Sequence, residues 1–384
     1  MKLKSILPVI LTLVFLSTAF AAQRSVPEDP DTHCLKLTFN GETIRGDYLL
    51  IDARTSEQKT RNLKEGKLDG SVIVFFHGHA QRPDDGYNFS SQLALKSKSG
   101  VVIIPVCDTP FGKNPAWRGD NGKDVLLMAM VRHVLHGLHI KVDGFRSITT
   151  AEVLVNGEQK ESPADSEPQM IPARISAIGW SHGSLLARRF ASNYQDAVID
   201  LAQVSPAGYL EWGNSSCYAS SCLMASFMWE SMRISTESFK GYAGAVFESG
   251  FGVVKGMTGD TARSCSSCLD GNLTLFKLFR NFRDTRDCTV YGNDTNFPVP
   301  HLKHLSVVFS ANDSLFDPED ILGRGMDVRP DKSTNDSFWK TFYPAAAANG
   351  TRLHLDILPG KHIGPICYPE QYANNVLRHI NQLK

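Results

Sequence analysis

Short apolar runs alternate with amphipathic stretches along much of the chain. Runs rich in β-branched and aromatic residues predict strands, and longer stretches with apolar positions three and four apart predict helices. Strands are predicted at residues 35–39, 43–51, 71–76, 101–106, 174–178, 197–204, 305–309 and 353–358, and helices at residues 89–98, 124–138 and 185–193. This alternation is typical of an α/β fold in which helices cover both faces of a mostly parallel, doubly wound sheet.

The alternation is interrupted in three places. Asn40-Gly41, a strong hairpin signal, separates the first two strands and predicts an antiparallel amino-terminal edge. The polar residues 147–172, with a second such signal at Asn156-Gly157 after residues 152–155, predict a peripheral excursion with an exposed hairpin. The long segment 205–300 predicts an insertion whose many large apolar residues suit either a substrate pocket or a core of its own.

Three polar side chains each follow a predicted strand. Ser181 comes after the strand at 174–178, Asp313 after the strand at 305–309, and His362 after the strand at 353–358. Because the carboxyl ends of parallel strands meet at one edge of a sheet, we expect the three to converge. A carboxylate that orients an imidazole, beside a serine, is the arrangement that makes a hydroxyl nucleophilic.

Ser181 lies in the pentapeptide Gly179-Trp180-Ser181-His182-Gly183, between a predicted strand and a predicted helix. A serine on such a sharp turn leaves no room for large residues two positions away, and the two glycines provide that room. The backbone N–H of His182 is then at a helix N-terminus, where it can stabilise an oxyanion.

The chain order of serine, acid and histidine, each just beyond a strand, resembles that of the α/β-hydrolase superfamily from about residue 35 to the end. The resemblance implies that Ser181 attacks a carbonyl, that His362 transfers the proton and that Asp313 fixes the imidazole tautomer. It also implies a second oxyanion donor, the backbone N–H of His79 or Ala80. In this superfamily an insertion between the sixth strand and the strand of the acid is commonly a cap or lid.

Each of these residues has competing interpretations. Ser181 could be an ordinary helix N-cap, and Asp313 an ordinary turn aspartate. Other candidates for the acid and the base are Asp317, Asp320, His301 and His304, of which the two histidines precede their strand and so lie at the wrong end of the sheet. A different set of histidines, His133, His136 and His139, falls on one side of the helix predicted at 124–138 and could bind a metal ion.

The first 22 residues have the composition of a signal peptide. Lys2 and Lys4 precede an apolar stretch at 6–16 that is too short to span a bilayer, and Ala19-Phe20-Ala21 resembles a cleavage site. The prediction is an exported protein, extracellular or, in a bacterium, periplasmic. The expected organisation is a signal peptide at 1–22, the first part of the hydrolase core at 23–204, a cysteine-rich cap or lid at 205–300, and the second part of the core at 301–384.

An exported chain meets an oxidising compartment, where its eight cysteines predict disulfides of open connectivity. Five of the cysteines cluster within the insertion, at positions 217, 222, 265, 268 and 288, and the Cys265-Ser-Ser-Cys268 pair could instead be half a zinc site or a redox pair. An excess of glycosylation sequons hints at a glycoprotein, and they lie at Asn88, Asn214, Asn272, Asn293, Asn312, Asn335 and Asn349.

Composition limits the class of function. The chain has 384 residues, 42% of them hydrophobic, and 40 basic residues balance 40 acidic ones, which fits a large globular core and argues against a nucleic-acid partner. The common nucleotide-binding strings are missing from the sequence. We therefore predict a secreted serine hydrolase, without metal or organic cofactor, that cleaves small-molecule, lipid or polymeric esters through an acyl-enzyme. The alternatives are a peptidase on the same fold and a non-catalytic binding module, and the oligomeric state stays open.

Overall fold

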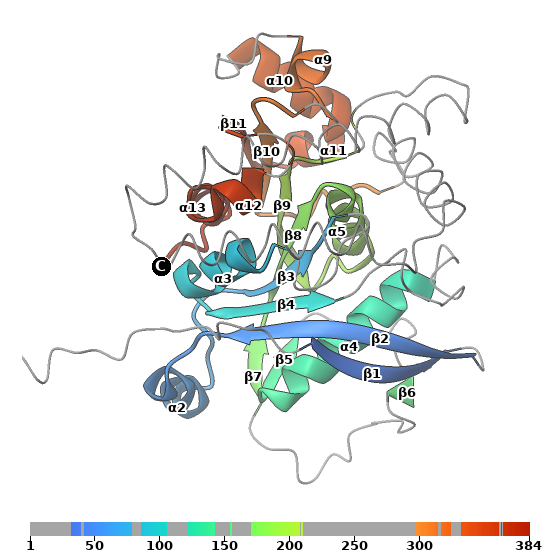
Figure 1. The fold of residues 1–384 in the computed structure, drawn as a ribbon, viewed down its shortest axis with the longest axis vertical. Coiled ribbons are helices and arrows are strands. Elements are labelled where there is room, and N and C mark those ends of the chain that lie inside the picture. The colour runs from blue at the N-terminus through green and yellow to red at the C-terminus, as the bar shows by residue number, and fades with distance from the viewer. Residues whose placement is uncertain are drawn as a thin grey trace, which may run out of the picture.

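The computed structural model describes residues 32–39, 42–78, 86–105, 122–142, 154–155, 170–207, 209, 297–313, 316–323, 332–360, 362 and 364–384 (Figure 1). The predicted signal peptide at 1–22 and residues 210–296 of the predicted insertion lie outside this part of the chain, so both stay predictions.

Within the described residues, nine strands form one sheet in the order β11-β10-β9-β8-β3-β4-β2-β1-β6. The strands of this sheet are β1 (Thr32–Phe39), β2 (Glu42–Asp52), β3 (Val72–Phe76), β4 (Val101–Pro105), β6 (Leu154–Val155), β8 (Ile175–Trp180), β9 (Val198–Val204), β10 (His304–Ser310) and β11 (Arg352–Leu358). In the part of the sheet with the order β11-β10-β9-β8-β3-β4, all adjacent strands are parallel. The strand β2 is antiparallel to both β1 and β4, and β1 is antiparallel to β6. The mostly parallel sheet and its antiparallel edge are both confirmed.

Helices cover both faces of this sheet, as Figure 1 shows. One face carries α3 (Tyr87–Lys96), α12 (Gly364–Cys367) and α13 (Pro369–His379), and the other carries α4 (Gly122–Gly137), α5 (His182–Asn193), α10 (Lys332–Phe342) and α11 (Pro344–Ala348). Outside this sheet, β5 (Ile140–Val142) and β7 (Ile171–Ala173) form a short parallel pair, and α9 (Pro318–Leu322) is a short helix after β10.

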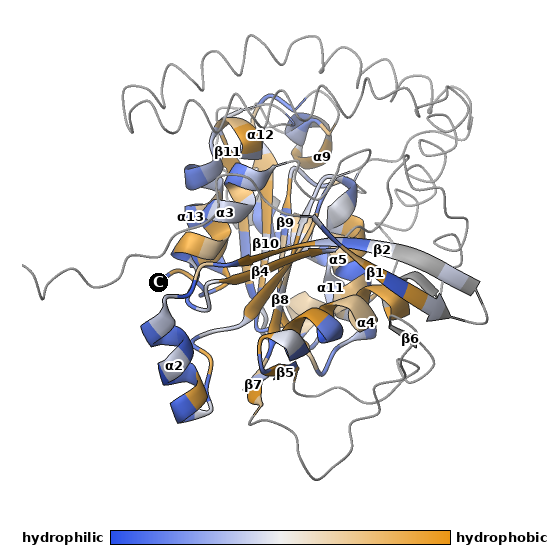
Figure 2. Ribbon diagram, turned by 60° about the horizontal axis from the view of Figure 1, so that its bottom comes forward, coloured by the Kyte–Doolittle hydropathy of each residue, from blue (hydrophilic) through white to orange (hydrophobic). Residues whose placement is uncertain are grey.

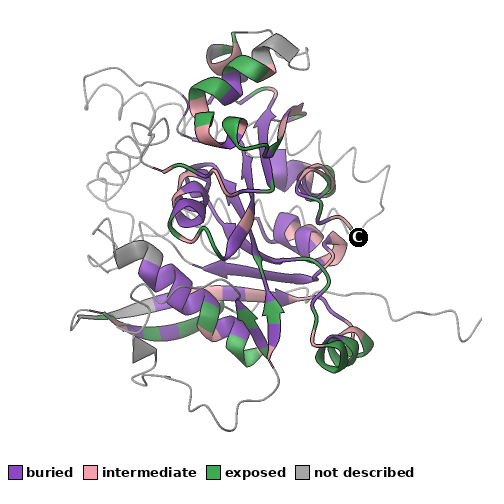
Figure 3. Ribbon diagram, turned by 180° about the vertical axis from the view of Figure 1, so that it is seen from behind, coloured by how far each residue is buried: buried purple, intermediate pink, exposed green. Residues whose placement is uncertain are grey.

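The apolar runs of the sequence become the central strands because both of their faces are covered. In β3, Val72, Val74 and Phe76 belong to the cluster that includes α5, while Ile73 and Phe75 belong to the cluster that includes α3. All five side chains are fully buried, and Figures 2 and 3 show that the central strands are hydrophobic and enclosed. A strand buried on both faces reads as a continuous apolar run.

The helix α2 (Ser56–Glu65), like α9 to α13, was not predicted from the apolar pattern. Most residues of α2 are polar and exposed, and Figure 3 shows its exposed surface. Its start nevertheless has a readable signal. Thr55 Oγ1 accepts from the Gln58 N–H at 3.2 Å, and Gln58 Oε1 accepts from the Thr55 N–H at 3.1 Å, which is a capping box. A polar surface helix of this kind is found from its cap, and not from its periodicity.

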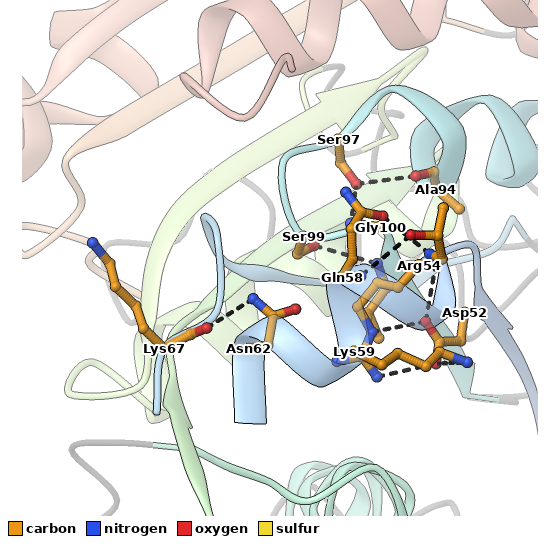
Figure 4. Close-up of polar contacts among 12 residues, drawn as sticks. Asp52, Arg54, Gln58, Lys59, Asn62, Lys67, Ala94, Ser97, Ser99 and Gly100 are labelled. Atoms are coloured by element: carbon orange, nitrogen blue, oxygen red, sulfur yellow. Dashed lines mark hydrogen bonds and ion pairs between the residues drawn. The ribbon is translucent and has the colours of Figure 1, made fainter. Parts of the chain in front are cut away.

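An ion cluster joins α2 to the end of β2 (Figure 4). Asp52 accepts from Arg54 Nε at 2.8 Å and lies 3.1 Å from Lys59 Nζ. Burial on its own would raise the pKa of the Asp52 carboxyl, but the hydrogen bonds and positive charges of Arg54 and Lys59 outweigh burial and lower it. The cluster is at the edge of the sheet where the parallel strands begin, so it serves the fold and not the candidate site.

Three sequence predictions need correction. The excursion at 147–172 is not peripheral at its end, because Ile171 is buried in the core and starts β7, which pairs with β5. The helix predicted at 89–98 begins at Tyr87 and ends at Lys96, because Ser97 already has extended dihedral angles. His139 does not share a helix face with His133 and His136, since α4 ends at Gly137 and His139 lies in the turn after it with φ 58°. Residues 156–157 lie outside the described part of the chain.

Candidate active site

The turn between β8 and α5 holds Ser181 in a strained conformation, with φ 55° and ψ −126°. Residues with a Cβ atom rarely adopt such angles. A Cβ atom on Gly179 would lie 2.5 Å from the Cα atom of Ser184, and one on Gly183 would collide with the carbonyl oxygens of Phe76 and His77. Both glycines are therefore sterically required, as the spacing of the pentapeptide predicted.

The imidazole of His362 joins the three predicted residues into one relay. Its Nε2 lies 2.8 Å from Ser181 Oγ, and its Nδ1 lies 2.8 Å from Asp313 Oδ2. The tautomer that satisfies both contacts donates from Nδ1 to the carboxylate and accepts the serine O–H at Nε2. Ser181, His362 and Asp313 are 8%, 7% and 1% exposed, so the relay is largely shielded from water.

Asp313 is held from two sides on the loop after β10. Its Oδ2 accepts from His362, and its Oδ1 accepts from the backbone N–H of Phe316 at 3.0 Å. The competing Asp317 instead caps α9 by accepting from the Glu319 N–H at 2.8 Å. Asp320 belongs to α9, and its side chain lies outside the described part of the structure.

The competing histidines lie at the opposite end of the sheet, where the parallel strands begin. His304 is the first residue of β10 and donates from Nδ1 to Asp200 Oδ1 at 2.7 Å. Asp200 also accepts from Ser176 Oγ at 2.7 Å, inside a buried network. His301 precedes β10, and burial lowers its pKa. Neither histidine approaches Ser181, so the predicted assignment of the base to His362 has the better geometry.

The two predicted oxyanion donors differ in what the structure describes. His182 is the first residue of α5, directly after Ser181, and the close contact of Gly183 with the end of β3 brings this helix start against the strand. His79 and Ala80 lie outside the described residues, so the second donor stays a prediction. The preceding His77 is buried, with Nδ1 2.8 Å from the carbonyl oxygen of Gly78.

The aromatic neighbours of the base were not predicted from the sequence. The centroid of the His362 ring lies 5.4 Å from that of Phe316 and 6.4 Å from that of Trp180. Trp180 Nε1 also donates to the His362 carbonyl oxygen at 3.1 Å. Trp180 was visible as the second residue of the pentapeptide, but no local pattern indicates a contact across 182 residues.

A chain of hydroxyl groups supports the loops of the acid and the base. Ser310 Oγ lies 2.6 Å from Ser205 Oγ and 2.7 Å from the Tyr372 hydroxyl, which donates to the Pro359 carbonyl oxygen at 2.9 Å. Burial raises the pKa of Tyr372 well above its usual value, so its hydroxyl stays protonated and can donate. These hydroxyls connect the ends of β9, β10 and β11 below the relay.

Other predicted features are tested only in part. Among the described residues no group of three side chains could hold a metal ion, and this includes the three histidines near α4. Of the cysteines, Cys34 and Cys367 are described and Cys107, Cys217, Cys222, Cys265, Cys268 and Cys288 lie outside, so disulfide pairing stays a prediction. Of the predicted sequons, Asn88, Asn312, Asn335 and Asn349 lie within the described residues. None of the helices in the described ranges is long and apolar enough to span a membrane.

No family model matches the chain, and no curated protein matches its sequence. A probable hydrolytic enzyme from Pseudomonas aeruginosa is similar in structure, with a TM-score of 0.50, 16% identity, and coverage of 91% of this chain and 94% of the other. The protein has the α/β-hydrolase fold. An esterase from Thermogutta terrifontis has 13% sequence identity and a TM-score of 0.46, and the match covers 91% of this chain and 99% of the other. An epoxide hydrolase from Vigna radiata has 11% sequence identity and a TM-score of 0.46, and the match covers 92% of this chain and 99% of the other.

Proposed function

We propose that the protein is a serine hydrolase that cleaves carboxylic esters through an acyl-enzyme intermediate. One observation carries the proposal, namely the continuous relay from Asp313 through His362 to Ser181, with both contacts at 2.8 Å. The strained turn that carries Ser181 supports it, because a serine that merely capped α5 would not need φ 55° or two glycine neighbours.

Each residue of the relay then has a definite role. His362 Nε2 takes the proton of Ser181 as Oγ attacks the ester carbonyl, and the His182 N–H stabilises the resulting oxyanion. The tetrahedral intermediate expels the alcohol, which receives that proton from the imidazolium. Water, activated by the same imidazole, then attacks the acyl-enzyme and releases the acid and free Ser181. Asp313 accepts from His362 Nδ1 and stabilises the imidazolium.

Shielding of the relay favours this chemistry. The carboxylate is almost fully buried, and a charge interaction is stronger in a protein interior than in water. The Phe316 and Trp180 rings are aromatic neighbours of the imidazole, and His362 itself is buried. A proton held between His362 and Asp313 is therefore kept apart from bulk water, which preserves the tautomer that the base needs.

Covalent labelling tests the proposal most directly. An aryl organophosphonate is expected to modify the native protein at Ser181 and to leave Ser181→Ala unmodified, as mapped by mass spectrometry. Turnover of an aryl ester is expected to fall by about 10³-fold or more in Ser181→Ala and in His362→Ala, with little change in melting temperature. Unlabelled native protein without esterase turnover would support the binding-module alternative and contradict the proposal.

A second measurement separates ester from amide cleavage. Aryl esters of several chain lengths are compared with matched amides at equal concentrations, since both reactions use the same three residues. We expect faster turnover of the esters. Faster turnover of the amides would identify the peptidase alternative.

We also propose that the protein is exported and that residues 1–22 are removed. Expression of the full chain in a secretory host, followed by amino-terminal sequencing, is expected to find the released protein starting directly after the cleavage-like Ala19-Phe20-Ala21, at Ala22 or Gln23. Retention of Met1 on protein that stays inside the cell would contradict export without bearing on the catalytic proposal.

A further inference from the structure

We propose that Trp180 is a positioning residue for His362, whose main chain it holds through its indole N–H. The inference rests on the proposed function, in which His362 is the base. It adds a residue whose part in the reaction is to fix the distance between base and nucleophile, without touching the reacting atoms.

The central observation is one hydrogen bond between two parts of the site. Trp180 Nε1 donates to the backbone oxygen of His362 at 3.1 Å, and Trp180 is the last residue of β8, directly before Ser181. The end of β8 therefore positions Ser181 and also binds the backbone of His362, the residue that must accept the serine proton. The separation of Ser181 Oγ and His362 Nε2 is set locally, and not only through the rest of the sheet.

The loop of His362 needs such a contact. It leaves β11 at Leu358 and enters α12 at Gly364, and its first part is tied down by the bonds from Asn312 N to Gly360 O at 2.9 Å and from Tyr372 to Pro359. Trp180 adds a bond to the backbone oxygen of His362 itself. A displacement of about 1 Å at a reacting group can lower turnover about 100-fold.

The indole is itself rigidly placed. Trp180 is 1% exposed and belongs to the hydrophobic cluster between the sheet and α3. A Cβ atom added to Gly86, which has φ 74°, would lie 3.2 Å from Trp180 Cζ3, so the backbone before α3 closes over the ring. Because the ring cannot rotate freely, the direction of its N–H is fixed toward the His362 loop.

Trp180→Phe tests the role of the N–H, because most of the ring remains. Trp339→Phe is the matched control, since Trp339 is 4% exposed and its Nε1 donates to Asn335 within α10, away from the relay. We expect Trp180→Phe to lower kcat for an aryl ester about 10- to 100-fold with KM within about twofold. Trp339→Phe is expected to keep kcat within about twofold of native. Equal kcat values for the two variants would overturn the proposal.

A mutant cycle distinguishes positioning from a direct effect on the substrate. If Trp180 acts through the base, Trp180→Phe has no further effect on the residual turnover of His362→Ala. The same fold-loss in the His362→Ala background as in native protein would overturn the proposal. Where Trp180→Phe fails to fold, 3-benzothienylalanine at position 180 keeps the indole shape without the N–H and is expected to show the same loss.

A spectroscopic measurement is independent of turnover. The imidazole proton shared by His362 Nδ1 and Asp313 is expected at strongly low field in the proton NMR spectrum of native protein and Trp339→Phe, and to weaken or shift in Trp180→Phe. If no ester or amide is hydrolysed but this signal depends on Trp180, the proposed function fails and the positioning role stands. A signal that is unchanged in Trp180→Phe would overturn the positioning role, whatever the reaction.

Discussion

Within the relay, Ser181 is the residue with a strained backbone conformation. Its φ of 55° is held by β8 on one side and α5 on the other, and its N–H donates to the Val204 carbonyl oxygen at 2.9 Å. A conformation of this kind costs about 1–3 kcal/mol and persists only where the surrounding structure enforces it. The strain is therefore a property of the folded state that removing the hydroxyl alone does not relieve.

Two substitutions at this position separate strain from chemistry. Ser181→Gly and Ser181→Ala both remove the hydroxyl and are expected to be equally inactive. Only glycine adopts a positive φ freely, so we expect Ser181→Gly to be more stable than Ser181→Ala by about 1 kcal/mol in urea unfolding.

Ser184 provides the control for this comparison, because it lies in α5 with ordinary helical geometry. There the order is expected to reverse, with glycine less stable than alanine by about 1 kcal/mol. A Ser181→Gly variant less stable than Ser181→Ala would show that the turn stores no strain.

At the scale of elements, Arg188 connects the helix behind the nucleophile to the rest of the carboxyl-terminal half. Its Nη2 donates to the Phe342 carbonyl oxygen at 2.9 Å and its Nε to that of Phe297 at 3.3 Å. The guanidinium also lies 4.3 Å from the centre of the Tyr343 ring. Arg188 is 4% exposed, so one buried cation joins α5 to α10 and to the chain just after residue 296.

A tyrosine pair extends this junction to the other end of the same segment. The Tyr209 hydroxyl donates to Gln203 Oε1 at 2.6 Å and lies 2.7 Å from the Tyr343 hydroxyl. Burial raises the pKa of both tyrosines, which keeps the hydroxyls protonated. Tyr209 and Phe297 are the described residues on either side of 210–296 in the sequence. Both are thus held by α5 and its neighbouring elements.

Arg188→Lys is expected to weaken this junction although it keeps the charge. An ammonium group cannot reproduce both fixed hydrogen bonds of the guanidinium and its contact with the Tyr343 ring, so we expect a loss of about 2–3 kcal/mol in the free energy of unfolding. Arg189→Lys is the control, because the neighbouring guanidinium makes a longer contact, 5.6 Å, with the Phe297 ring and is less buried. Equal losses for the two variants in urea unfolding would count against the junction.

At the scale of the whole molecule, three partly buried histidines predict how stability depends on pH. Burial lowers the pKa of His301, His354 and His379 below the usual 6.5. A histidine with a lower pKa in the folded state takes up its proton more readily after unfolding. The free energy of unfolding is therefore expected to fall as pH drops below about 6.5 and to level off below the folded-state pKa values.

The stacked pair of this set offers the test. The His354 and His379 rings lie 4.4 Å apart, and His379 Nε2 is 3.4 Å from Asp356 Oδ2. Other charged groups that act on the pair are Arg352, His304 and Arg378. Urea unfolding between pH 7.5 and 5 is expected to show a shallower decrease in the free energy of unfolding for the double variant His354→Gln/His379→Gln than for native protein. His136→Gln, at an exposed position on α4, is the control and is expected to keep the native slope.

Local patterns in the sequence were sufficient for the positions of most strands along the chain, the edge hairpin and the strained serine turn. Apolar runs, the Asn40-Gly41 pair and the two glycines around Ser181 act through neighbours in the chain, so their physical consequences are readable without coordinates. The cap of α2 was equally local, at Thr55 and Gln58, although the apolar pattern did not indicate that helix.

Only the tertiary structure decided which histidine meets which carboxylate and what holds the base in place. His304 with Asp200 and His362 with Asp313 are both close pairs, at 2.7 and 2.8 Å, and one of the two lies beside Ser181. The contact of Trp180 with the His362 loop joins residues 182 positions apart. Such pairings depend on how strands are ordered and packed in space, because a hydrogen bond responds to distance and angle and not to separation along the chain.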